Sequence, residues 1–165
     1  MQIIIKKLKS NNAGCLYKIL YNGDKINIKL INTKSLFGIE NQYNIKSIKW
    51  IIEKSEIEKI QIIENLIVNK FKEIQIQIDE MKSKIINKPN YPTMILSKIN
   101  KNKTSNDIIK HEIGEITSFN EINKSCLYDV SLSLSTIFIK KLGKKNILHY
   151  TIETDLITKK AICVT

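Results

Sequence analysis

Lysines and aromatic residues occur close together in the first fifty residues of this sequence. Tyr21 precedes an Asn-Gly turn, and Tyr43 follows a Phe-Gly loop. Trp50 alternates with Lys46 and Lys49 along one short segment. Lysine side chains attract phosphates, and a flat ring can stack on an unpaired base. These residue types in this pattern indicate a surface for a single-stranded polyanion, with packing in the core as the alternative role for each ring.

A second group of lysines surrounds Gly143 and forms the densest basic turn of the chain. Such a turn suits phosphate contacts, although a solvated hairpin tip explains the same cluster equally well. The two groups together make up the set of residues that we expect to contact nucleic acid. These residues are Tyr21, Lys29, Tyr43, Lys46, Lys49, Trp50, Lys140, Lys141, Lys144 and Lys145.

The distribution of charge favours a basic β surface over a basic helix. The 165-residue chain has a formal net charge of +11, and all 27 of its basic residues are lysines. Residues 1–50 carry a surplus of +7 and residues 86–110 a surplus of +4, whereas residues 51–85 sum to −1. A helix that reads duplex DNA presents its basic residues on one face, so the segment 51–85 does not fit that role.

Alternation of apolar and polar residues predicts a series of strands. Residues 15–21 and 25–32 alternate on either side of Asn22-Gly23, a dipeptide typical of a tight hairpin turn. We therefore expect these two strands to form a hairpin. Further strands are expected at residues 45–53, 93–99, 127–139 and 149–157.

The period of the apolar residues changes after Ser55, where they become spaced by three and four. This spacing predicts one amphipathic helix, which ends near Glu73 or continues to Met81. We expect the helix to pack on the sheet, with coiled-coil pairing as the alternative.

The order of these elements predicts an α+β fold. The sheet is expected to be mainly antiparallel and OB-like, curled or closed into a barrel, with one substantial amphipathic helix. A chain of this length can bury one continuous core, so residues 1–165 are expected to form a single nucleic-acid-binding domain.

No motif for catalysis, for a metal or for a cofactor stands out. The sequence lacks glycine-rich phosphate loops and the HExxH and GxSxG patterns. The pairs His111-Glu112 and Asp79-Glu80 are the acid–base candidates, but isolated carboxylates on solvated segments seldom take part in catalysis. We therefore expect a non-catalytic binding protein without metal or cofactor.

The cysteines and the lack of long apolar runs predict the cellular compartment in which the protein is found. Cys15, Cys126 and Cys163 are odd in number and far apart, a pattern of buried thiols. No apolar run matches a signal peptide or a membrane span, so no membrane partner is expected. We expect an intracellular, reducing compartment, which is the host cytoplasm or a viral factory if the chain is viral.

Four short motifs within residues 15–158 carry a family resemblance. They are Leu36-Phe37-Gly38-Ile39, Ile62-Ile63-Glu64-Asn65, the segment from Lys88 to Thr93, and the strand that ends with residues 134–139. The arrangement resembles the OB-fold single-stranded-DNA-binding proteins of large nucleocytoplasmic DNA viruses. The resemblance implies an accessory protein of replication and repair that coats exposed single strands.

The predicted function is non-catalytic, sequence-tolerant binding of single-stranded DNA in viral DNA replication or repair, through a lysine-rich groove with stacking aromatic rings. RNA as the bound strand and association with further copies of the chain stay open. The alternative is a basic structural protein, from a virion or associated with ribosomes, that neutralises nucleic acid without base stacking. Exposed rings within one basic groove would favour the first function over the second.

Overall fold

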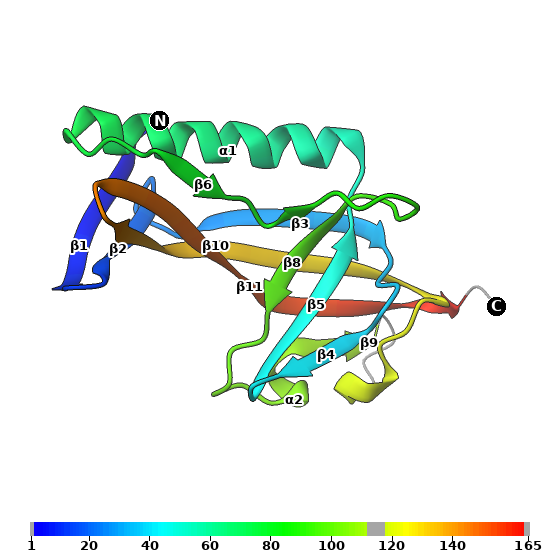
Figure 1. Ribbon diagram of the computed structural model, residues 1–165. Helices are drawn as coiled ribbons and strands as arrows, with labels where there is room; N and C mark the ends of the chain where they lie inside the picture. Colours follow the sequence, from blue (N-terminus) through cyan, green and yellow to red (C-terminus); the bar gives the residue numbers. More distant parts are fainter. Residues whose placement is uncertain (1, 112–117, 164–165) are drawn as a thin grey trace. The chain divides into compact units, whose positions relative to one another are not determined.

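The computed structural model describes residues 2–111 and 118–163, which divide into two compact units (Figure 1). The first unit contains the residues up to Ile26 together with Lys54–Lys84 and Leu134–Thr151. The second unit contains Asn27–Glu53, Ile85–Ser133 and the residues from Ile152 onward. The expected single-domain organisation stays a prediction.

Two long strands contribute residues to both units. They are β10 (Cys126–Leu142) and β11 (Lys145–Cys163). Their lengths exceed the predicted strands at 127–139 and 149–157, which lie inside them. The apolar alternation of β10 buries every second residue along most of its length, as the sequence pattern requires.

The first unit combines antiparallel strands with one long helix. β1 (Ile3–Asn11) pairs with β2 (Gly14–Tyr21), and β2 also pairs with residues 136–140 of β10. A short strand, β6 (Glu80–Lys82), runs parallel to β11. Strand β1 was not among the predicted strands, because its run of three isoleucines is too short to show a clear alternation.

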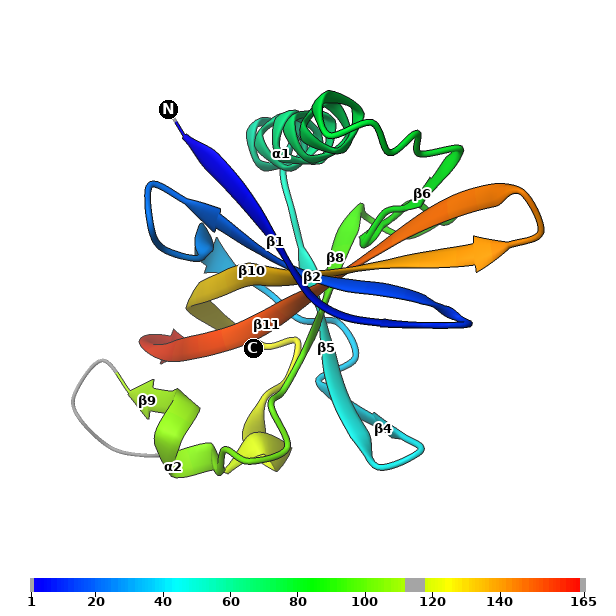
Figure 2. The same ribbon diagram turned by 90° about the vertical axis from the view of Figure 1, so that its left-hand side faces the viewer.

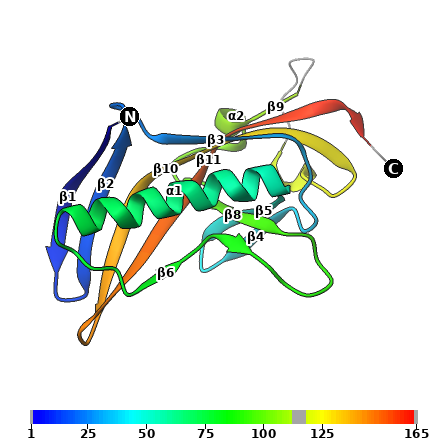
Figure 3. The same ribbon diagram turned by 90° about the horizontal axis from the view of Figure 1, so that it is seen from above.

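Helix α1 (Lys54–Glu73) covers one side of the strands of the first unit, as Figures 1 and 3 show. The buried residues of α1 are spaced by three and four, and they form the face that the sequence predicted. Phe71 meets Tyr17 of β2 edge to face, with 5.0 Å between the ring centroids. This contact confirms that the helix packs on the sheet.

The end of α1 follows from a backbone motif at Gln75, which has a φ of +63°. The Ile76 N–H donates to the Phe71 carbonyl (2.9 Å), and the Gln75 N–H donates to the Lys72 carbonyl (3.0 Å). These two bonds form the Schellman arrangement that satisfies the last carbonyls of a helix. The earlier of the two predicted helix ends is therefore the one that the structure has.

A buried carboxylate also lies on the inner face of α1. Glu64 is 7 % exposed, and its Oε2 accepts a hydrogen bond of 2.6 Å from the Tyr150 hydroxyl of β11. The same hydroxyl accepts a bond from the Lys84 N–H (2.9 Å). Burial and the neighbouring Glu64 raise the pKa of Tyr150 well above its ordinary value. The raised pKa keeps the hydroxyl protonated at neutral pH, so it can donate the bond that joins helix α1 to strand β11.

The second unit contains the strands on which the candidate site is built. β5 (Ile45–Ile51) lies between β4 (Ile39–Gln42) and β8 (Met94–Lys98), all antiparallel, as Figures 1 and 2 show. β8 runs parallel to β11. The remaining elements of this unit are β3 (Ile26–Thr33, of which Ile26 belongs to the first unit), β7 (Ile85–Ile86), α2 (Ser105–Ile108), β9 (Ile109–His111) and the 3-10 turn Phe119–Glu121.

Strands pair mainly antiparallel, with parallel pairs along β11, and α1 is the one substantial helix of the described residues. The hydrogen-bonded order β1-β2-β10-β11-β8-β5-β4 is not closed into a ring. The predicted α+β class with a mainly antiparallel sheet is therefore confirmed.

The expected hairpin between residues 15–21 and 25–32 is wrong, although both strands exist. Asn22 and Gly23 have positive φ, as a tight turn requires, and one isolated bridge joins Tyr21 to Asp24. Among the described strands, however, β2 pairs with β1 and β10, while β3 pairs with β10. Both edges of β2 are thus taken, and no edge is left for β3.

We predict that Tyr150→Phe lowers the free energy of unfolding by about 1.5–3 kcal/mol, since it removes a buried hydrogen bond to a carboxylate. Urea denaturation monitored by circular dichroism measures the change. Tyr128→Phe serves as a matched control, because the buried Tyr128 hydroxyl accepts from the Asn123 N–H, a neutral group. Its loss should cost about 0.5–1.5 kcal/mol. Equal losses in the two variants would contradict the role given to Glu64.

Candidate nucleic-acid interface

A basic hollow lies where β5 begins and β8 ends, within the second unit. Its volume is about 400 Å³. Four lysines and a single carboxylate, Glu153, supply the charged groups of its wall, and none of the four lysines forms an ion pair with another residue of the described chain. The hollow therefore carries an excess of positive charge. The lining residues are Asn44, Ile45, Lys46, Lys98, Ile99, Asn100, Lys101, Lys103 and Glu153.

A highly exposed aromatic residue directly precedes the first lining residue of this hollow in the chain. Tyr43 is 89 % exposed and directly precedes Asn44 in the two-residue turn between β4 and β5. Both turn residues have positive φ, +53° for Tyr43 and +62° for Asn44. Such turns favour Gly and Asn, because a Cβ lies too close to the following carbonyl oxygen there, glycine lacks a Cβ, and the short Asn side chain can form local hydrogen bonds. The chain thus places an aromatic ring where neither packing nor backbone preference calls for one.

The register of β5 and β8 decides which residues share the open face of the sheet. Ser47 lies opposite Lys98, and Lys49 lies opposite Leu96. Directly opposed residues point to the same side, and successive residues point to opposite sides. Lys49, Lys98 and Ile45 therefore share one face, all of them half-buried or exposed. The other face carries buried residues such as Ile48 and Trp50.

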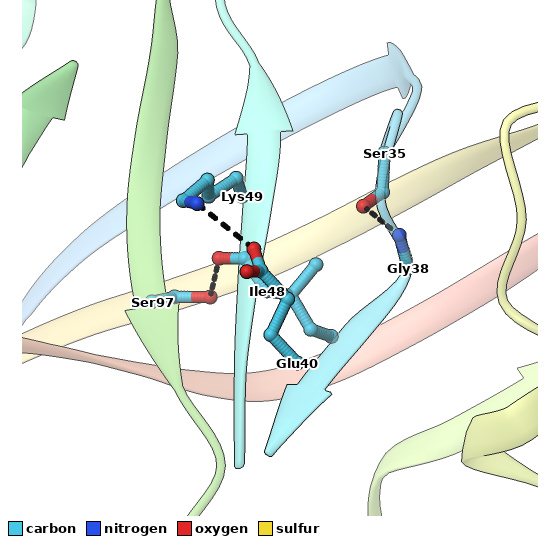
Figure 4. A network of polar contacts seen from close by, with 6 residues as sticks. All are labelled: Ser35, Gly38, Glu40, Ile48, Lys49 and Ser97. Carbon is cyan, nitrogen blue, oxygen red and sulfur yellow. Dashed lines mark hydrogen bonds and ion pairs between the residues drawn. The ribbon is translucent and has the colours of Figure 1, made fainter. Parts of the chain in front are cut away.

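A second aromatic group lies over the same face, near the far end of β5. The Lys49 ammonium lies 2.9 Å from Oε1 of Glu40 and 5.4 Å from the centroid of the Phe37 ring. Figure 4 shows the ion pair between Lys49 and Glu40. Phe37 in turn contacts Tyr91, with 5.7 Å between the ring centroids.

The expected stacking role of Trp50 is wrong. Its side chain is 0 % exposed, and its Nε1–H donates to the buried Ser97 hydroxyl at 3.2 Å. The indole also packs against Tyr128, with 5.7 Å between the ring centroids. The sequence placed Trp50 beside lysines, but Trp50 and Lys49 are neighbours in the chain and therefore point to opposite faces of the strand.

The remaining predicted residues fall into separate places, and their contact with nucleic acid stays a prediction. In the second unit, Lys46 lines the hollow, and its ammonium lies 5.4 Å from the centroid of the Phe119 ring. Lys29 is exposed on β3 and does not line the hollow. In the first unit, Tyr21 is half-buried beside its turn. Four exposed lysines form the tip between β10 and β11: Lys140, Lys141, Lys144 and Lys145.

Three lysines of the hollow were missing from the predicted set: Lys98, Lys101 and Lys103. The surplus of +4 in residues 86–110 was the available signal. That surplus does not show which strand the segment joins. Lys98 comes to lie near Lys46 because β8 pairs with β5, with the Lys46 carbonyl accepting from the Ile99 N–H at 2.8 Å.

The acid–base candidates do not form a site in the described residues. The Asp79 carboxylate accepts from the Asn146 N–H at 2.8 Å, and Glu80 pairs with Lys82 at 2.6 Å. The neighbouring Lys82 lowers the pKa of Glu80. Glu112, of the pair His111-Glu112, lies outside the described residues.

The described residues also bear on metal binding, membrane spanning and the state of the cysteines. Within residues 2–111 and 118–163, no cluster of His, Cys, Asp and Glu is arranged to hold a metal ion, and no helix is long and apolar enough to cross a membrane. Cys15 is a free thiol, but Cys126 is disulfide-bonded. The expectation of buried thiols is therefore wrong at Cys126, and the expected compartment stays a prediction.

Comparison with known proteins shows a likeness in fold. No family model matches the sequence, and no curated protein matches it. A solved structure described as "Single-stranded DNA-binding protein from bacteriophage Enc34, C-terminal truncation" has a TM-score of 0.53 and 15 % identity over 94 % of each chain. Another, "Single-stranded DNA-binding protein from bacteriophage Enc34", has a TM-score of 0.48 and 13 % identity over 94 % of this chain and 89 % of that chain.

The first likeness confirms the predicted OB-like fold. At 15 % identity it shows the fold alone. The structure with the TM-score of 0.53 is a phage protein, so the comparison does not support an origin in large nucleocytoplasmic DNA viruses.

We predict that iodide does not quench the emission of Trp50, the single tryptophan of the chain, because the indole has no exposed surface. Stern–Volmer titration of the native and the urea-unfolded protein measures this difference. Trp50→Ala should also lower the free energy of unfolding by about 3–5 kcal/mol. Equal quenching of native and unfolded protein would contradict the burial of Trp50.

Proposed function

We propose that this chain binds single-stranded DNA without catalysing a reaction, and that the basic hollow with Tyr43 is its main contact. The observation that carries the proposal is the 89 % exposed Tyr43 ring beside a hollow with four lysines. Positively charged side chains contact the phosphates, and an aromatic ring stacks on an unpaired base. A site that binds single strands combines both contacts. The likeness in fold to a phage single-stranded-DNA-binding protein supports the same function.

The residue types of the hollow suit sequence-tolerant binding. Lysine carries a compact charge on a flexible stem and lacks the rigid fork with which arginine reads a guanine edge. Every base has a flat face, so stacking on Tyr43 does not select among bases. We therefore propose a protein that coats exposed strands, as needed in replication or repair of viral DNA.

The basic tip of the first unit, Lys140 to Lys145, is proposed as an auxiliary phosphate contact. Its four lysines are exposed, and none forms an ion pair with another residue of the described chain. Exposed ammonium groups of this kind add affinity for phosphates without base preference. A basic structural protein, from a virion or a ribosome, would bind through such charges alone, and loss of Tyr43 would not affect it.

We predict that log K for oligothymidine falls linearly with log salt. Each phosphate contact contributes about −0.7 to the slope, because binding releases condensed counterions. Replacing Lys98, Lys101 and Lys103 together by Gln should make the slope shallower by up to about 2. Fluorescence anisotropy with labelled oligothymidine measures the slope.

The matched control removes the same number of charges from the exposed surface of α1. It replaces Lys54, Lys59 and Lys72 by Gln. We expect this variant to keep the slope of the native protein. If both triple variants change the slope equally, net charge rather than the hollow governs binding, and the proposed site is wrong.

We predict that Tyr43→Asn weakens binding of oligothymidine about 5- to 150-fold, the effect of losing one stacked base. Asparagine favours the positive φ of this position, so the melting temperature should be equal or higher. Tyr43→Phe should bind as the native protein does. Unchanged affinity in Tyr43→Asn would favour the basic structural protein over the single-strand binder.

A further inference from the structure

The second unit exposes a pair of touching aromatic rings in addition to Tyr43. Phe37 is 45 % exposed and Tyr91 is 51 % exposed. Their ring centroids lie 5.7 Å apart, and the ring planes are inclined by 57°. Large rings contribute most to stability when they are buried. A pair that stays half open on the surface therefore calls for an explanation.

The loop that carries Phe37 is fixed in place. The Gly38 N–H donates to the buried Ser35 hydroxyl at 3.1 Å, a bond drawn in Figure 4. Gly38 has a φ of +63°, and a Cβ there would lie 2.6 Å from the Ile122 carbonyl oxygen. Glycine is thus required at this position, and the neighbouring Phe37 is held at the surface by backbone contacts and not by a flexible loop.

The chain around Tyr91 is also constrained. Asn90 has a φ of +68°, and the Tyr91 N–H donates to the Lys88 carbonyl at 3.2 Å. The Lys49 ammonium, held by Glu40, approaches Phe37 at 5.4 Å from its centroid. Phe37 is therefore supported by Lys49 and by Tyr91, while about half of the Tyr91 side chain remains open to a ligand.

The ring pair lies over the face of the β4-β5-β8 sheet to which two lining residues of the hollow, Ile45 and Lys98, also point. Lys49, which contacts Phe37, points to the same side as Ile45 and Lys98 of the hollow. Lys49 and Ile45 are four residues apart on β5, a distance of about 13 Å along an extended strand. A flexible strand of a few nucleotides that occupies the hollow can reach the rings across this distance.

We propose that Tyr91, backed by Phe37, is a second base-stacking subsite for the same single strand of DNA. The inference rests on the proposed function. Charge favours this occupant over a protein: the Lys49 ammonium lies at the Phe37 ring, the Glu40 carboxylate is paired with that lysine, and Lys98 of the four-lysine hollow points to the same face. One base stacks on the open face of Tyr91, while neighbouring nucleotides fill the hollow.

The test compares thymidine dinucleotide with an oligothymidine of about 16 nucleotides, the upper limit of the site sizes seen for OB folds. Tyr91→Ala should bind the long oligonucleotide about 5- to 150-fold more weakly than the native protein does. The dinucleotide is too short to occupy the hollow and reach Tyr91 at the same time, so its affinity should change less than twofold. The melting temperature should stay the same, because Tyr91 is half exposed.

Conservative variants separate stacking from apolar contact. Tyr91→Phe should bind the long oligonucleotide as the native protein does, and Tyr91→Leu should behave like Tyr91→Ala. Ile31→Ala removes an exposed apolar side chain of β3 and serves as the matched control with native affinity. Tyr91→Trp adds a direct signal, since the new indole should be quenched by the long oligonucleotide while the buried Trp50 is not.

The outcomes distinguish the two proposals. If the native protein binds neither oligonucleotide at low salt, the proposed function fails and the subsite fails with it. If the native protein binds but Tyr91→Ala and Tyr91→Leu match it on the long oligonucleotide, only the subsite is overturned. Loss of self-association in Tyr91→Ala with unchanged DNA binding, measured by sedimentation, would instead assign the rings to contact with a second copy.

Discussion

The candidate site depends on one buried chain of hydrogen bonds that fixes the register of β5 on β8. The Trp50 indole donates to the Ser97 hydroxyl, which lies 2.6 Å from the Thr154 hydroxyl of β11 and also donates to the Ile48 carbonyl. Side chains alternate along a strand, so a slip of one residue would turn every side chain of β8 to the other face. Lys98 would then point into the core, and buried polar groups would lose their partners. The core bond thus determines where the lysines lie.

The exposed rings depend on local backbone features that oppose ordinary preferences. Tyr43 occupies a turn position with positive φ, and Phe37 is followed by a glycine that no other residue can replace without a clash. Conformations of this kind cost about 1–3 kcal/mol for residues with a side chain, and they are retained where the surrounding structure enforces them. Both features place an aromatic ring in solvent beside lysines. Stability does not explain this placement, whereas the proposed binding to an unpaired base does.

The two units contribute different features to the proposed function. The second unit holds the hollow, Tyr43 and the ring pair, so charge and stacking occur together there. The first unit holds the helix, fastened by the bond between Tyr150 and Glu64, and presents a basic tip at the end of β10. Neither unit contains arginine, and lysine suits contacts that follow a flexible backbone and need no fixed geometry.

The sequence by itself determined the class of elements and the mainly antiparallel sheet, and it limited the end of the helix to two alternatives. These features depend on periodicity and on turn residues, which act over a few neighbours. The tertiary structure alone decided that Trp50 is core, that β2 and β3 do not pair, and that Lys98, Lys101 and Lys103 join Lys46. Strand pairing joins residues that are about fifty positions apart, and its register selects the face of every side chain. Local patterns carry no information about that choice.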